Sequence, residues 1–484
     1  MKELTDWLAD PVPSRFPYPA VTHAYHVVGK HFVPDETLKL LALARERLVS
    51  QAPTPAGAQH RLLLDRFLDT ALDKWDGRYD YPTYTSLNVL GLPTADDGPD
   101  AAEGARITRD RLTVQLLADL LRFEQAAAEG RTAWLPEMRP DARTVEKRCR
   151  LALRVARPAL ARLGHGERIT AEEPAGQAAQ LWEFVDGELL EPYERMVLKL
   201  SMLPVYISHD EHMFIRVLQT FETTFALLAL SIRTAIGGLD GAGPGSLPAA
   251  TGHLKVAETV LAESAPLFSL LATMQVESFR VFREYTDGAS AIQSRNYKLV
   301  ESLCRMPDQE RLESPAYRST PEVRERVLAG QATLDDACAA ALADPRFTAG
   351  DRELLTASML GFAGALRRWR QTHYRIAVRM LGTRSGTGAT EGTPYLSSVR
   401  KIPVFRSIDE APADEAPAVT ETPAVTETPA AAEPPAGTPA APAAAAPGSP
   451  PVADAPAGCP AATGAAPTGC PVTTAPRTES EEAA

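Results

Sequence analysis

One segment of the chain joins a histidine expected on a helix to a loop rich in glycine and threonine. It runs from Trp369 to Leu396 and reads WRQTHYRIAVRMLGTRSGTGATEGTPYL. Trp369 and His373 are four residues apart, so on a helix they share one face. A neutral imidazole projecting from such a face is a suitable axial ligand for haem iron. A histidine satisfied inside an apolar core is the alternative interpretation of the same pattern.

The loop that follows could bring the main chain close to a bound molecule. Gly386, Gly388 and Gly392 permit backbone conformations that other residues rarely adopt. The hydroxyl of Thr387, between two of these glycines, can donate or accept a hydrogen bond. Glycine-rich turns are common, so the loop is informative only because it follows His373 at a fixed offset. His373 and Thr387 are therefore the two residues to explain.

Two further blocks of sequence accompany this segment in the same order as in a known family. HDEHMFIRVLQTFE spans residues 209–222, and FREYTDGASAIQSRNYKLVE spans residues 282–301. Together with W-R-x-x-H and G-T-G-x-x-x-G, they resemble the signature segments of the tryptophan 2,3-dioxygenases. The resemblance covers somewhat under half of the chain, and three motifs in sequence are more specific than any one of them.

The resemblance implies a cofactor and a substrate for the matched residues. His373 would be the proximal ligand of the iron in haem b. The other residues beside the cofactor would be Trp369, Gly386 and Gly388. Arg283 would pair with the substrate carboxylate, since a planar guanidinium matches a carboxylate bidentately. Thr387 would contact the substrate ammonium, and Phe214 would pack against an indole ring; a solvated Arg283 and a core Phe214 are the alternatives.

One position departs from the family pattern. Four residues after Phe214, where the dioxygenases carry a distal histidine able to bind the indole N–H, this chain has Leu218. Leucine offers no hydrogen-bonding group, and an unmatched N–H in a buried site costs on the order of 1–3 kcal/mol. The loop also carries Ala389, Thr390 and Glu391, which bring a carboxylate near the expected substrate amine. Substrate and reaction are therefore in doubt more than haem binding.

The run His209–His212 permits another interpretation, because two histidines three apart with adjacent carboxylates could ligate a non-haem metal. No second pair of comparable quality follows in the apolar helices. The family resemblance instead implies that these polar residues cap and anchor the helix that carries Phe214.

These motifs lie in a chain whose apolar residues show a helical periodicity over most of its length. Apolar residues recur at three- and four-residue intervals over 37–50, 61–74, 108–128, 145–163, 211–236, 254–284 and 352–381. Turn-rich breaks occur at 93–105, 164–176 and 237–252. We expect an all-α fold, a helical bundle enclosing a haem pocket, with the haem held by residues 206–400.

The ends of the chain differ from this core. The segment 409–484 is rich in Ala, Pro and Thr and carries eleven acidic residues and one arginine, so we expect a disordered acidic tail that accounts for most of the net charge of −12. Its two Gly-Cys-Pro steps, at Cys459 and Cys470, resemble haem-regulatory motifs or reflect repeat drift. Cys149, Cys304 and Cys338 are expected to be buried apolar residues. The composition favours neither nucleic-acid binding nor a membrane span, and we expect a cytoplasmic protein.

The first 205 residues carry the weakest signal. YDYPTYTSLNVLGLP, at 79–93, faintly resembles the tyrosine-containing N-terminal segment of the dioxygenases. If that similarity is real, about a hundred residues, around 94–200, have been inserted before the HDEH block. If it is accidental, residues 1–205 form a separate helical region of unknown role.

Two functions of different class follow. The first is a haem-dependent dioxygenase that converts L-tryptophan and O2 to N-formylkynurenine, as in tryptophan catabolism through the kynurenine pathway. A close variant is a monooxygenase or ring-rearranging enzyme acting on tryptophan or another aromatic amino acid. The second is a haem-binding or scaffold protein without turnover, whose tail recruits a partner. The family resemblance also implies a homo-oligomer, commonly a homotetramer.

Overall fold

The computed structural model describes residues 1–50, 57–240, 243–286, 288–382, 384, 386 and 392–408. They belong to one compact unit, Met1–Ala418. The predicted tail with Cys459 and Cys470, and the loop residues Thr387, Gly388 and Glu391, lie outside the described residues. Within these ranges the secondary structure is helical, and the single extended pairing is an isolated bridge between Glu137 and Ser208. The prediction of an all-α fold is confirmed.

The helices fall into a long and a short class. The long ones are α3 (Asp35–Ser50), α4 (Ala58–Ala71), α7 (Ala102–Ala128), α8 (Ala142–Arg162), α11 (His209–Leu239), α12 (Leu247–Glu263) and α20 (Ala349–Leu381). The shorter ones are α1 (Lys2–Ala9), α2 (Tyr18–Val28), α5 (Tyr81–Tyr84), α6 (Leu87–Leu90), α9 (Pro174–Phe184), α10 (Pro192–Leu200), α13 (Pro266–Leu271), α14 (Val276–Glu284), α15 (Arg295–Cys304), α16 (Gln309–Leu312), α17 (Pro315–Arg318), α18 (Pro321–Leu328), α19 (Leu334–Ala343) and α21 (Thr393–Val399).

One predicted helix is wrong. Residues 254–284 form three helices, α12, α13 and α14, instead of one. Pro266 begins α13, because proline lacks the backbone N–H that a continuous helix needs and fits the first turn of a new one. Gln275 is extended ahead of α14, and the chain bends by 95° between Leu271 and Val276. After this bend, α14 packs against α11 and α20.

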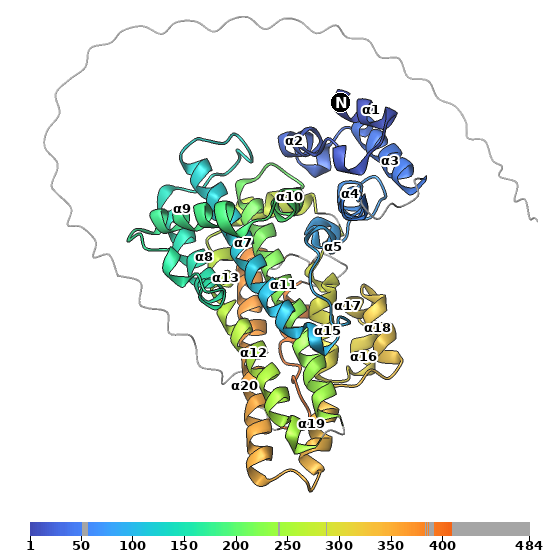
Figure 1. Cartoon of the computed structure of the whole chain (residues 1–484), viewed down its shortest axis with the longest axis vertical. Coiled ribbons are helices and arrows are strands. Elements are labelled where there is room, and N and C mark those ends of the chain that lie inside the picture. Colours follow the sequence, from blue (N-terminus) through green and yellow to red (C-terminus); the bar gives the residue numbers. More distant parts are fainter. Residues whose placement is uncertain are drawn as a thin grey trace, which may run out of the picture. The chain divides into compact units, whose positions relative to one another are not determined.

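Helix α11 is the centre of the core. It packs against α7, α12 and α15, and α20 packs against α12 (Figure 1). Helix α11 is long and apolar enough to cross a membrane, but 89% of its most apolar stretch is buried inside the protein, as in the core helix of a globular protein. Its composition is therefore explained by its contacts with other helices.

The polar start of α11 is anchored by buried charges. Asp210 accepts a hydrogen bond from Arg148 on α8 at 2.6 Å, and Arg148 also pairs with Glu124 on α7 at 2.8 Å. Glu124 lies 3.2 Å from Nε2 of His209. Among the described residues, no group of three or more histidine, cysteine, aspartate and glutamate side chains could hold a metal ion. The HDEH block therefore ties α11 to α7 and α8, as the family resemblance implies.

The N-terminal helices contact the segment just before α11. Gly29 has a φ of +84°, and a Cβ at this position would lie only 2.6 Å from the carbonyl oxygen of Val205. The next two backbone N–H groups, of Lys30 and His31, donate to the carbonyls of Pro204 and Val205. Only glycine allows this close approach. The boundary near residue 205 and the insertion around 94–200 remain predictions about how the chain is organised.

Candidate functional site

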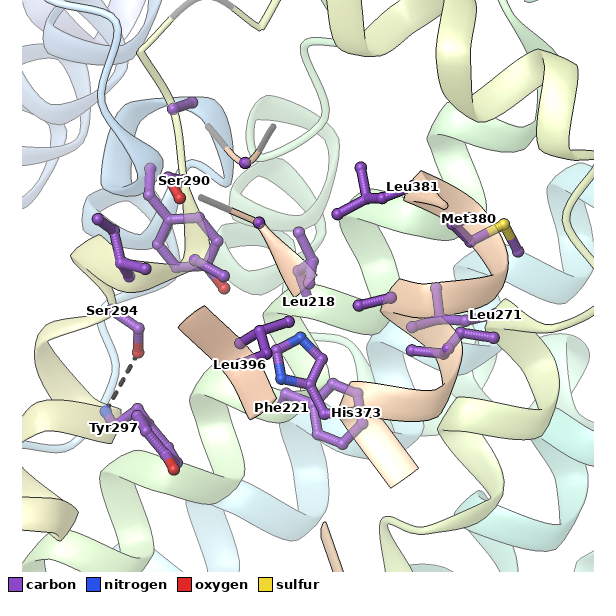
Figure 2. Close-up of a pocket in the computed structure, with 18 of the residues that line it drawn as sticks. Leu218, Phe221, Leu271, Ser290, Ser294, Tyr297, His373, Met380, Leu381 and Leu396 are labelled. Carbon is purple, nitrogen blue, oxygen red and sulfur yellow. Dashed lines mark hydrogen bonds between the residues drawn. The ribbon is translucent and has the colours of Figure 1, made fainter. Parts of the chain in front are cut away.

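A cavity of about 260 Å³ lies among α5, α11, α14, α15, α20 and α21. Its walls are mostly aromatic and aliphatic. Figure 2 shows His373 and Leu218 near its middle, with Ser290, Ser294 and Tyr297 on one side and Leu271, Met380 and Leu381 on the other. A mostly apolar cavity with a few polar side chains is typical of a small-molecule or cofactor site.

One wall is a face of α11. Phe214, Leu218, Phe221, Glu222 and Phe225 line the cavity, and their spacing of three and four residues places them along one stripe of the helix. Phe214 and Leu218 are only partly buried, although their neighbours on α11 are almost all buried, because these two side chains face the cavity. Leucine contributes no hydrogen-bonding group, so this stretch of the wall between the two phenylalanines is apolar.

A second wall is a face of α20. Trp369 and His373 both line the cavity, with their ring centroids 5.2 Å apart. Phe268 lies beside the imidazole, with centroids 6.2 Å apart. Burial lowers the pKa of His373 to about 4, so the ring is neutral at physiological pH. Within the described ranges no hydrogen bond to either ring nitrogen accompanies these ring contacts, and a neutral imidazole is the form that binds metals.

Arg283 lies near the end of α14 and lines the same cavity. Its side chain is half-buried, and burial together with the positive charge of Arg384 lowers its pKa. Two guanidinium groups near one another produce a positive potential at this side of the cavity. Such a position favours a carboxylate, which is the ligand that arginine recognises bidentately.

The structure therefore brings together most of the residues singled out from the sequence. The cavity-lining ones among them are Phe214, Leu218, Arg283, Trp369, His373 and Gly386. Thr387 and Gly388 fall outside the described residues, and their roles remain predictions. Gly386 and Gly392, which flank this gap, both line the cavity.

Other cavity residues were missed from the sequence. Tyr81 and Tyr84 of α5 line the cavity, although their segment gave only a faint resemblance. The Tyr84 hydroxyl donates to Oε1 of Glu211 at 3.4 Å, and burial raises the pKa of Glu211 to about 8. The only available signal was the repeated tyrosine in YDYPTY.

A second group of missed residues forms a charged end of the cavity. Lys298 and Arg311 both pair with the buried Glu301, at 3.1 and 2.6 Å. Arg370 donates to the Tyr297 hydroxyl at 2.9 Å. Burial and the neighbouring arginines lower the pKa of Lys298 to about 8 even though Glu301 opposes the change. These residues come from three helices, so no local pattern marks them as a group.

Comparison with known proteins agrees with the geometry. No protein-family model matches the chain. Curated tryptophan 2,3-dioxygenases of Burkholderia multivorans, Burkholderia lata and Burkholderia cenocepacia are each 25% identical to it over 240 residues, which covers 42% of this chain and 75% of each relative. The three sequence motifs, the all-α fold and this similarity agree: the chain is a distant relative of the tryptophan 2,3-dioxygenase family.

Proposed function

We propose that this chain is a haem-dependent oxidoreductase that opens the indole ring of L-tryptophan to N-formylkynurenine with O2. The observation that carries the proposal is that His373, Arg283 and Phe214 line one cavity, although they come from three helices. The relatives named tryptophan 2,3-dioxygenase support the same substrate and reaction.

The cavity suits haem b held by His373. Its imidazole is neutral and has no competing hydrogen bond from the described residues, so an electron pair is available for iron. The surrounding aromatic and aliphatic side chains match the apolar faces of a porphyrin. When bound, haem iron supplies the activation of O2, which protein side chains do not provide.

The side chains of this chain would bind and orient the amino acid. Arg283, with Arg384 nearby, receives the substrate carboxylate. The Phe214 ring packs against Phe282 at 5.3 Å and Phe279 at 5.8 Å between centroids, and this fixed ring offers a face to an indole. Thr387 and Gly388 would contact the substrate ammonium and the cofactor respectively. The apolar walls exclude water from the reacting ring.

A second reaction is favoured by Leu218. Because this side chain lines the cavity without a donor or acceptor, the indole N–H receives no help at this position. A monooxygenation or ring rearrangement of tryptophan or another aromatic amino acid is the second candidate. The proposed assignment also includes a homo-oligomer, for which the support is the family resemblance, and a cytoplasmic location, for which the support is the composition.

An optical spectrum tests the cofactor and its ligand. Haem-loaded wild type should show a Soret band that His373→Ala abolishes, while Tyr374→Phe, on the next position of α20, should retain it. Incubation of the reduced protein with tryptophan should then produce the absorbance of N-formylkynurenine. Product mass under labelled O2 separates the two candidates, because a dioxygenase incorporates two labelled atoms and a monooxygenase one. A Soret band that persists in His373→Ala would reject the ligand assignment.

A further inference from the structure

A buried carboxylate faces the cavity with one oxygen unmatched. Glu222 lies on α11 two turns after Phe214, lines the cavity and is 0% exposed. Its Oε2 accepts a hydrogen bond from Nδ2 of Asn296 at 3.0 Å. Its Oε1 is buried and has no hydrogen-bond partner among the described residues.

Because Glu222 is ionised, a missing hydrogen bond to Oε1 destabilises the folded protein. Burial raises its pKa to about 6, while Ser294, Asn296 and Tyr81 stabilise the ionised form. At neutral pH the group is therefore mostly a carboxylate. The hydroxyls of Tyr81 and Ser294 lie near the carboxylate, but neither donates to Oε1, which has no hydrogen-bond partner among the described residues. A buried charged acceptor without a donor is more destabilising than a neutral one, so a donor supplied by a ligand or by water would complete the site.

The chemistry of the cavity restricts what that donor can be. The porphyrin of haem offers no free N–H once iron occupies its centre, so the donor comes from the other ligand or from water. Leu218 lies one turn before Glu222 on the same face, about 6 Å along the helix axis. On this wall of α11, Glu222 is therefore the acceptor that an N–H can reach.

We propose that Oε1 of Glu222 accepts a hydrogen bond from an N–H of the bound aromatic amino acid, and so selects ligands that carry one. The inference rests on the proposed function, because it needs an amino acid in this cavity. Two N–H groups share this chemistry in tryptophan, the ring nitrogen and the α-ammonium. Glu222 would position the substrate through this bond, with Tyr81 and Ser294 beside it.

The test measures binding to the haem-loaded full chain by the shift of its Soret band. The ligands are L-tryptophan, 1-methyl-L-tryptophan, which lacks the ring N–H, and indole-3-propionate, which lacks the ammonium. Glu222→Gln is nearly isosteric, but its amide can present an oxygen either to Asn296 or to the ligand, not to both. We expect this variant to bind tryptophan at least tenfold more weakly than wild type.

The analogues identify which N–H is bound. If the ring N–H is the donor, 1-methyl-L-tryptophan binds wild type and Glu222→Gln equally, whereas indole-3-propionate still loses affinity in the variant. If the ammonium is the donor, indole-3-propionate binds wild type and Glu222→Gln equally, whereas 1-methyl-L-tryptophan loses affinity in the variant. Glu258→Gln, a carboxylate on α12 that pairs with Lys255 outside the cavity, is the matched control and should leave all three affinities unchanged.

Other outcomes overturn the inference. Equal binding of tryptophan to wild type and Glu222→Gln would mean that water alone satisfies Oε1. If Glu222→Gln fails to load haem, Glu222→Asp carries the test, since it keeps the charge but withdraws the oxygen by one methylene. A wild-type Soret band that tryptophan never perturbs would reject the proposed function itself, and this result is distinct from binding that is insensitive to Glu222.

Discussion

Trp369 and His373 pack ring against ring on one face of α20, with centroids 5.2 Å apart. The indole in turn contacts Phe221, Phe225 and Phe268 at centroid distances of 5.7, 5.2 and 5.4 Å. The imidazole that would bind iron is thus oriented by an aromatic cluster that spans α11, α13 and α20. A ligand ring held in this way loses little conformational entropy when it binds a metal.

Truncation of Trp369 tests how much this aromatic cluster stabilises the fold. Trp369→Ala should lower the free energy of unfolding by about 3–5 kcal/mol, because it leaves a cavity among buried rings. Trp369→Phe should cost much less, since the indole Nε1 is buried without a hydrogen-bond partner in the described part of the chain. Urea unfolding of both variants measures the difference. Equal losses in the two variants would contradict the packing argument.

Three histidines with lowered pKa values should make the protein sensitive to acid. Burial lowers the pKa of His26, His212 and His373 to about 4. In the unfolded chain these three groups titrate near 6.5, so between pH 6.5 and 4 they bind more protons in the unfolded state. The raised pKa values of Glu211 and Glu222 act in the opposite direction, but they concern two groups against three. We expect the stability of the haem-free protein to fall as the pH decreases through this window. Thermal unfolding at several pH values checks it, and a stability that rises toward pH 4 would contradict it.

Arg283 should govern affinity for the carboxylate end of the ligand. Arg283→Gln should weaken tryptophan binding by roughly ten- to a hundredfold, the range expected for hydrogen bonds to a charged group. Tryptamine, which has no carboxylate, should bind wild type and variant alike. Arg283→Lys keeps the charge but not the planar fork, so its affinity for tryptophan should lie between those of wild type and Arg283→Gln. Equal losses for both ligands would show that Arg283 acts on the fold of α14 instead.

The sequence predicted the long amphipathic helices because their apolar residues recur over several turns. The apolar pattern did not show that 254–284 breaks, because it continues on both sides of Pro266 and the extended Gln275. Pro266 is the local signal of this break, since proline favours the first turn of a new helix. Helices of a single turn, such as α5 and α16, are too short to show any period. Helix boundaries therefore depend on contacts that a local pattern does not contain.

In the site, too, some residues could be predicted from a local sequence pattern and others could not. His373, Arg283, Phe214 and Leu218 were found because each belongs to a motif with fixed spacing. Glu222 belongs to the same block as Phe214, but its role depends on burial and on an oxygen left without a donor. Such properties arise only when distant helices meet, so they become visible in the structure alone.

A prediction about stability follows from Arg148, which joins α8 to α7 and α11 through buried ion pairs. Its side chain is 0% exposed and pairs with Glu124 and Asp210. Arg148→Met would leave two buried carboxylates without their cation, which should destabilise the protein by about 3–5 kcal/mol. Arg150→Met, on the exposed face of α8, should change stability by less than about 1 kcal/mol. Chemical denaturation measures the free energy of unfolding of both variants. Similar losses in the two would contradict the prediction that the buried ion pairs stabilise the fold.

Leu218 offers the most direct test of how the cavity treats an indole. Leu218→His places an acceptor on the wall of α11 at the position where the family resemblance implies a histidine. If an indole ring lies beside Phe214 and Glu222 binds the ammonium instead of the ring N–H, the variant should bind tryptophan roughly ten- to a hundredfold more tightly, because the ring N–H gains a partner in a buried site. The affinity for 1-methyl-L-tryptophan should not rise, since its ring nitrogen has no hydrogen to donate.

Leu218→Asn is the matched comparison, because it adds a shorter polar side chain at the same position. Soret titrations of the haem-loaded proteins measure the affinities, and product mass shows whether the number of incorporated oxygen atoms changes. A gain that is equal for tryptophan and its 1-methyl analogue would mean that the new imidazole contacts some other part of the ligand. A loss for both ligands would mean that the ring occupies the space of Leu218 itself, and that this chain orients its substrate differently from the dioxygenases.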